Sequence, residues 1–194
     1  NRPGFEPGQH GGELRFLIGR PQDTRMAVVY GYARLVGYTP TFDLVPDILE
    51  DVINEDERVF TLKLRRGHRW SDGHPFTSED FRYYWEDWAN NKRLSPVGPP
   101  RTLLVDGKPP KVEFLDPYTV RYSWQGPNPH FLPALGAAYP LYIFRPAHYL
   151  KQFHQRYADP KALADAVKSA NMRNWAQLHN RLDNAYRNDN PDLP

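Results

Sequence analysis

The feature that most constrains the fold is the stretch of residues 60–88, in which a strand pattern, a tight turn and a helix start follow one another. Apolar residues alternate with polar ones in its first part: Phe60, Leu62 and Leu64. This period of two predicts a strand with one buried face. Asp72 and Gly73 follow shortly after Trp70. They indicate a tight turn, because Asp bonds to nearby backbone and Gly accepts positive φ.

A helix is expected to begin directly after this turn. Thr77 stands at the N-cap position, and Asp80 three residues later gives an imperfect capping box. Glu79 and Asp80 also lie favourably at the positive end of the helix dipole. Four large aromatic residues recur at helical spacing on one face: Phe81, Tyr84, Trp85 and Trp88. Such a face must be covered, so we expect this helix to pack on a sheet.

Two further strands are expected on either side of the turn at residues 116–118, because apolar residues alternate there. These residues are Val112 and Phe114 before the turn and Val120, Tyr122 and Trp124 after it. With the strand at Phe60 they would form an antiparallel sheet under the aromatic helix. Residues 90–110 contain five prolines and are expected to form a long loop, and residues 127–139 an irregular connector. The sequence thus predicts an α+β subdomain over residues 42–138.

The flanking segments are expected to belong to a larger domain. Residues 1–13 are rich in Pro and Gly, which indicates a flexible lead-in. Residues 14–41 have the pattern of a strand, a loop and a helix, and the helix would run from Arg25 until Gly37 ends it. Residues 139–194 are expected to be mostly helical. Two helices are predicted to start there at Pro146 and at Asp159, and a third is predicted to carry Trp175, Leu178, Leu182 and Tyr186.

The order of strand, WSDG turn and acidic capped helix resembles the signature of the family 5 extracellular solute-binding proteins. These are the dipeptide- and oligopeptide-binding components of ABC importers. The run LRRGHRWSDGHPFTSEDF at residues 64–81 carries the resemblance. Two further stretches support it: GGELRFLIG at residues 11–19 and YARLVGYTPTFDLVPDILEDV at residues 32–52.

The resemblance implies an α/β fold of the periplasmic binding protein type II class. This chain would be an N-terminal fragment of such a protein, because family members are much longer. It would hold a partial first lobe, made of residues 14–41 and a truncated, mostly helical return at residues 139–194. The predicted α+β subdomain at residues 42–138 would be inserted between them.

The function implied by the resemblance is the capture of a small solute or peptide between two lobes and its delivery to the permease subunits of an ABC transporter. The protein would be periplasmic or otherwise extracytoplasmic in a bacterium, with its leader absent from this chain, and monomeric. An alternative is a ligand-sensing domain of a signalling or regulatory protein with the same fold. Peptides, sugars, opines and metal chelates all remain open as ligands.

Other function classes lack their minimum sequence signals. The chain has no cysteine, so thiolate metal sites and cysteine nucleophiles are excluded. No histidine pair lies at the spacing of a helical metal site, and no nucleophile-elbow, P-loop or dinucleotide-binding motif occurs. A net charge of +2 gives no electrostatic footprint for nucleic acid. We therefore expect no enzyme activity, no cofactor, no metal and no nucleic-acid partner.

Two loops are the candidate ligand contacts that the resemblance points to. The first lies at residues 19–24 after the opening strand, with Arg20, Gln22 and Asp23 as the candidate side chains. The second lies at residues 94–98 and contains Ser95 and Val97. In oligopeptide binders a tyrosine follows the Ser-Pro pair and contacts the peptide backbone. Here Val97 takes that place and cannot make the hydrogen bond. Ordinary surface connection is the competing interpretation of both loops.

Overall fold

The computed structural model describes residues 11–13, 15, 17, 19–20, 34–137, 140–184, 190 and 192–194. The helix expected to start at Arg25 lies outside these residues up to position 33. Of the strand expected within residues 14–19, only residues 15, 17 and 19 are described, and they belong to neither helix nor strand.

The predicted antiparallel sheet is confirmed, and β3, a strand that the sequence did not predict, extends it to four strands in the order β3-β4-β6-β5. Their bounds are Leu49–Glu55 for β3, Val59–Leu64 for β4, Lys111–Asp116 for β5 and Thr119–Ser123 for β6. Phe60 pairs with Tyr122, and Leu62 pairs with Val120. All four of these side chains are buried. The alternating apolar residues of the two central strands therefore share one face, as the period of two requires.

The prediction that the N-terminal helix continues to Gly37 is wrong. Val36 and Gly37 lie in β1 (Val36–Tyr38), which forms a two-stranded hairpin with β2 (Leu44–Pro46). Val36 is buried and lies opposite Pro46. Its apolar side chain fits the helical spacing of the preceding residues equally well, but a β-branched residue is also well suited to a strand. Here the cross-strand pairing decides the structure.

The helix after the WSDG turn starts where the sequence predicts. Thr77 is the N-cap of α2 (Ser78–Arg82), and both hydrogen bonds of the capping box with Asp80 are present. The helix continues as a π-helix, η2 (Tyr83–Ala89), which the sequence did not indicate. The Asn90 backbone N–H and side-chain Nδ2 both donate to the Trp85 carbonyl, at 3.3 and 2.7 Å, and close its end.

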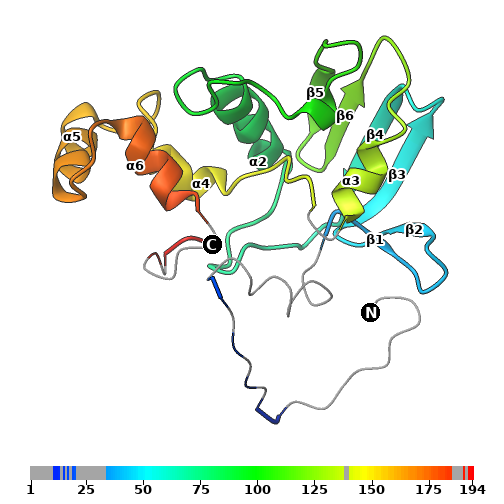
Figure 1. The fold of residues 1–194 in the computed structure, drawn as a ribbon, viewed down its shortest axis with the longest axis horizontal. Coiled ribbons are helices and arrows are strands. Elements are labelled where there is room, and N and C mark those ends of the chain that lie inside the picture. Colours follow the sequence, from blue (N-terminus) through cyan, green and yellow to red (C-terminus); the bar gives the residue numbers. More distant parts are fainter. Residues whose placement is uncertain are drawn as a thin grey trace.

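The aromatic face of this helix is only partly buried in the core. Phe81 and Tyr84 are fully buried, whereas Trp85 and Trp88 are half-buried. The core combines them with residues from the sheet and from α3 (Phe131–Gly136): Phe60, Leu62, Leu64, Val120, Tyr122, Phe131 and Leu135. Figure 1 shows α2 lying between this sheet and the C-terminal helices.

Helix α3 corrects the expectation of an irregular connector at residues 127–139. Phe131 packs against Phe60 with 5.1 Å between ring centroids and against Trp124 with 5.0 Å. Pro133 lies in the first helical turn, where the missing N–H is not needed. Pro and Gly content alone therefore hid a short helix whose aromatic residue fills the core.

The predicted helical character of residues 140–184 is confirmed. The elements are α4 (Ala147–Leu150), the 3-10 turn η4 (Lys151–Phe153), α5 (Pro160–Ser169) and α6 (Trp175–Leu182). Asp159 caps α5 and Asn174 caps α6 through their side chains. The long loop at residues 90–110 is also confirmed, apart from the 3-10 turn η3 (Arg101–Leu103). Across the described residues, no helix combines the length and apolar character needed to span a membrane.

Candidate functional site

The loop at residues 91–98 leaves the end of η2 and is folded by its own hydrogen bonds. The Ser95 N–H donates to the Asn91 carbonyl at 2.7 Å, and the Gly98 N–H donates to the Ser95 carbonyl at 3.0 Å. The Ser95 hydroxyl donates to the Gly98 carbonyl at 2.8 Å. Gly98 has a φ of +80°, which is left-handed backbone that favours glycine. The loop therefore has a defined shape before any ligand arrives.

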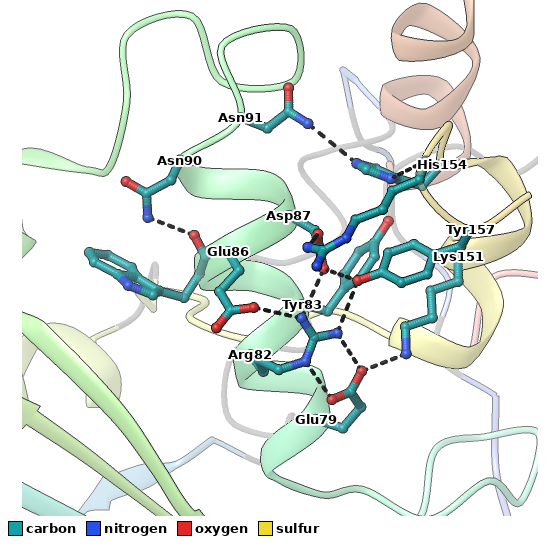
Figure 2. Close-up of polar contacts among 12 residues, drawn as sticks. Glu79, Arg82, Tyr83, Glu86, Asp87, Asn90, Asn91, Lys151, His154 and Tyr157 are labelled. Atoms are coloured by element: carbon teal, nitrogen blue, oxygen red, sulfur yellow. Dashed lines mark hydrogen bonds and ion pairs between the residues drawn. The ribbon is translucent and has the colours of Figure 1, made fainter.

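Apolar packing and a hydrogen bond fix the same loop to η2 and α6. Leu94 is buried among Trp88, Trp175 and Leu178, and the Asn180 amide donates to its carbonyl at 3.3 Å. Figure 2 shows the Asn91 amide directed at His154, with 3.3 Å between Nδ2 and Nε2. A loop held on a rigid scaffold in this way is the usual setting of a binding residue.

The predicted contact residues have different environments. Ser95 is buried and its hydroxyl is used inside the loop, whereas Val97 is 95% exposed. Arg20 is exposed, and Gln22 and Asp23 lie outside the described residues. The structure thus brings Ser95 and Val97 together in one loop. Ser95 shapes that loop, and Val97 presents an apolar side chain to solvent.

A charged network lies beside this loop, between α2, η2 and the turn after η4. Figure 2 shows Arg82 at its centre, bonded to Glu79, Glu86 and Asp87. Asp87 is buried and also accepts from the Tyr157 hydroxyl at 2.7 Å and from Arg156 Nη1 at 2.9 Å. Lys151 bonds to Glu79 from the opposite side.

Carboxylates in such a cluster invite an acid/base interpretation, but these are paired with cations. Burial would raise the pKa of Glu79, and the hydrogen bonds from Arg82 and Lys151 outweigh it, so that the net pKa is lowered. Three acidic side chains face three basic ones here: Glu79, Glu86 and Asp87 against Arg82, Lys151 and Arg156. The cluster is therefore best understood as a structural link between helices.

A second buried group joins η2 to α6. The Tyr83 hydroxyl and His179 Nε2 share a hydrogen bond of 2.6 Å, and both side chains are fully buried. Burial lowers the pKa of His179 to about 3, so its ring is neutral at ordinary pH. Among the described residues no group of three or more His, Asp or Glu side chains is arranged to hold a metal ion.

Asp80 holds the WSDG turn through its carboxylate. One carboxylate oxygen of Asp80 accepts from the Thr77 N–H at 3.0 Å and from Trp70 Nε1 at 3.2 Å. The other accepts from the Ala147 N–H at 3.1 Å. Burial raises the pKa of Asp80. The sequence indicated the cap, but not the bond to Ala147, which lies 67 residues away.

One shallow pocket of about 360 Å³ lies between the start of α2 and the turn that joins β5 to β6. Its walls include Glu79, Arg82, Phe114 and Asp116. Asp116 accepts from the Tyr118 N–H at 2.7 Å, and Glu79 is paired with Arg82. Its charged groups are thus engaged within the chain.

A family model described as "Bacterial extracellular solute-binding proteins, family 5 Middle" matches residues 43–176. The match covers well over half of the 194 residues. The chain belongs to this family. The resemblance expected from the sequence is thereby confirmed.

Relatives in this family are binding proteins. The periplasmic alpha-galactoside-binding protein of Rhizobium meliloti (strain 1021) is 32% identical over 131 residues, covering 61% of this chain and 18% of the relative. The periplasmic oligopeptide-binding protein OppA of Salmonella typhimurium is 28% identical over 144 residues, covering 67% of this chain and 26% of the relative.

Solved structures of binding proteins have the same fold. A structure of the oligopeptide-binding protein OppA matches 97% of this chain with a TM-score of 0.80 and 29% identity. MelB from Agrobacterium fabrum C58, in complex with stachyose, matches 77% with a TM-score of 0.55 and 25% identity. The expected periplasmic binding protein fold is confirmed. This chain spans less than a third of the length of each of these four proteins.

Proposed function

We propose that this protein captures a small solute outside the cytoplasm and delivers it to the permease of an ABC importer. The observation that carries the proposal is the similarity to OppA along 97% of the chain, in a family of solute-binding proteins. Periplasmic relatives support an extracytoplasmic location. Binding without chemical change also agrees with the paired state of the charged cluster around Arg82. No feature of the described residues favours the sensor alternative.

The loop at residues 91–98 is the part of the ligand site that we assign to this chain. Val97 would contact the solute through van der Waals packing, since its side chain has no hydrogen-bonding atom. Ser95 would act by holding the loop shape. Arg20, Gln22 and Asp23 remain predicted contacts from the N-terminal loop.

Two ligand classes are supported by the relatives. One is an oligosaccharide, as in the alpha-galactoside-binding protein and in the stachyose complex of MelB. The other is a peptide, as in OppA. An exposed valine favours contact with the apolar face of a sugar ring or with an apolar side chain over contact with a backbone amide. Burying an amide without a hydrogen-bond partner costs free energy.

Thermal unfolding of the protein at its full natural length, with stachyose or trialanine, tests this proposal. A true ligand at 100 times its dissociation constant adds about 2.7 kcal/mol, which corresponds to a rise in Tm of about 2 °C for a protein more than three times as long as this chain. Val97→Asp should abolish that rise and leave the Tm without ligand within about 1 °C, since the native side chain faces solvent.

The matched control is Leu115→Asp, which changes another exposed apolar residue, on β5. This variant should keep the full ligand response. An unchanged response in Val97→Asp would remove the loop from the site. No response of the unaltered protein to a panel of oligosaccharides and peptides would contradict solute capture itself.

A further inference from the structure

The candidate loop after η2 carries two cations at the corner of a tight turn. The N–H groups of Leu94 and Ser95 donate to the Asn91 carbonyl at 3.1 and 2.7 Å. The Arg93 N–H donates to Asn91 Oδ1 at 2.9 Å. These bonds hold the backbone of Lys92 and Arg93, and both residues are exposed. A turn with a fixed backbone therefore presents two positively charged side chains to solvent.

Val97 lies on the same side of this loop as the two cations. Exposure alternates in pairs along the chain: residues 92–93 are exposed, residues 94–95 are buried, and residues 96–97 are exposed. The buried pair faces the helices, against which Leu94 packs. The outward side of the loop therefore combines positive charge with the apolar side chain of Val97.

The positive charge of the loop has no acidic counterpart among the described residues. Residues 88–105 contain no Asp and no Glu. The two acids that precede this stretch, Glu86 and Asp87, bond to Arg82. None of the ion pairs within the part of the chain that the structure describes involves the two cations of the loop. An anionic group that approaches this side therefore meets positive charge that no carboxylate of the chain neutralises.

We propose that Lys92 and Arg93 make this loop select solutes that carry a carboxylate, with Val97 packing on the apolar part next to that group. A guanidinium matches the two oxygens of a carboxylate with two parallel N–H donors, and an ammonium adds a compact positive charge. A neutral oligosaccharide offers neither cation an anionic partner. The inference rests on the proposed function, because it concerns the ligand class of the same loop.

The expected selectivity is modest, because both cations are exposed to water. An exposed ion pair changes a binding constant by roughly 1.4- to 5-fold, so the two together should favour the acid by roughly 2- to 30-fold. Salt weakens such pairs, since exposed charges are screened over about 8 to 10 Å at ordinary ionic strength. A preference for the acid that shrinks with added salt is thus the expected signature of this loop.

The test is isothermal titration of the protein at its full natural length with pairs of solutes that differ only in carboxylate groups. Trialanine and its C-terminal amide form a peptide pair, and trigalacturonate and its methyl ester form a sugar pair. A solute of any other kind that binds is compared with its own neutral or acidic counterpart in the same way. We expect the acid of a pair to bind roughly 2- to 30-fold more tightly than its neutral partner. The difference should shrink as NaCl is raised from about 0.05 to about 0.5 M.

The double variant Lys92→Gln with Arg93→Gln removes both charges and keeps polar side chains on the turn. It should lose the preference for the acid and keep its affinity for the neutral partner within about twofold. The matched control is Arg58→Gln with Lys108→Gln, which removes the same two charges from exposed positions on the sheet subdomain. Lys108 contacts only the neutral side chain of Gln125 through its ammonium group. This control should keep the full preference.

Several outcomes would overturn the inference and leave solute capture standing. These are equal affinities within every pair that binds, tighter binding of the neutral members, and an unchanged preference in the double variant of the loop. Loss of the preference in the control as well would mean that the net charge of the protein, and not this loop, selects the acid. If no peptide, oligosaccharide or other solute bound to the unaltered protein, solute capture itself would be contradicted, and this inference would fall with it.

Discussion

At the scale of single residues, Asp80 accepts more hydrogen bonds than its place in the capping box requires. Its carboxylate joins the start of α2, the indole of Trp70 and the backbone of Ala147. These three partners come from the turn, the helix and the distant α4 segment. The buried acid is stable there because backbone and indole N–H donors replace the water that it loses.

Asp80→Ala should therefore cost more than the loss of a cap. A lost N-cap side chain costs about 0.5 to 2 kcal/mol, and each buried donor left without a partner adds about 1 to 3 kcal/mol. We expect a loss of roughly 2 to 5 kcal/mol in the free energy of unfolding, measured by urea denaturation. Thr77→Ala, which removes the other half of the capping box, should cost only about 0.5 to 2 kcal/mol. Equal costs for the two variants would contradict this account of Asp80.

His179 should make the fold sensitive to acid. Its pKa is lowered to about 3 in the folded chain by burial, while an unfolded histidine has a pKa near 6.5. Between these values the unfolded state binds more protons than the folded state. The contribution of neutral His179 to the free energy of unfolding is therefore complete above pH 6.5 and is lost progressively as the pH falls toward 3. In His179→Gln the amide oxygen can still bond to the Tyr83 hydroxyl, and no group titrates at this position.

The difference in unfolding free energy between the native chain and His179→Gln should shrink as the pH is lowered from 7 to 4. Urea denaturation at each pH measures it, and the carboxylates common to both proteins cancel in the difference. A pH-independent difference would mean that His179 becomes charged within the fold.

At the scale of elements, the sequence predicted β4, α2, β5 and β6, because alternation and capping are local signals, whereas β3 and α3 were not predicted. The capping box at Thr77 and the strand at Phe60 are examples. The π-helix η2 was missed because its aromatic spacing also fits an α-helix. Trp85 and Trp88 are half-buried and pack against the core that buries Phe81 and Tyr84.

The sequence predicted where the candidate loop lies along the chain, but not the hydrogen bonds that shape it. A Ser-Pro pair marks a turn, but the engagement of the Ser95 hydroxyl with the Gly98 carbonyl depends on the folded backbone. The bond between Asp72 and His148, and that between Asp80 and Ala147, join residues about 70 positions apart. No local pattern contains such pairs, since they arise only when α4 packs on the turn.

Asp87 links η2 to the turn after η4, and its replacement should loosen that turn selectively. Asp87→Asn keeps the shape of the side chain but places an amide N–H₂ against donors from Arg82, Arg156 and the Tyr157 hydroxyl. We expect a loss of about 1 to 3 kcal/mol in stability and faster amide exchange in residues 151–158. Glu86→Gln, at a more exposed partner of Arg82, should change stability by less than about 1 kcal/mol. Equal effects of the two changes would argue against a linking role for Asp87.

At the scale of the whole molecule, the sheet subdomain and the C-terminal helices have separate apolar clusters. Trp88 packs against both the sheet core and the helical cluster around Trp175. Arg145 stands at the same junction. Its guanidinium donates to Asp183 at 2.8 Å and lies over the ring of Trp88 at 4.8 Å and that of Tyr84 at 5.5 Å. Figure 1 shows α4 and α6 beside α2, where this junction lies.

Arg145→Ala should therefore uncouple the two parts of the chain. Asp183 has a side chain only 9% exposed and would lose its cation, and breaking a buried pair on one side costs about 3 to 5 kcal/mol. Because the sheet core does not contain Asp183, hydrogen exchange should show α4 and α6 losing protection before β4 and β6 as urea is added. Arg145→Lys keeps the charge without the planar stacking. The protection of α4 and α6 in this variant should fall between that in Arg145→Ala and that in the unaltered chain. Arg101→Ala, at an exposed position in η3, should behave as the unaltered chain does. If all elements of Arg145→Ala lost protection together, the junction would not depend on this guanidinium, and contacts such as those of Trp88 would have to hold the two parts together.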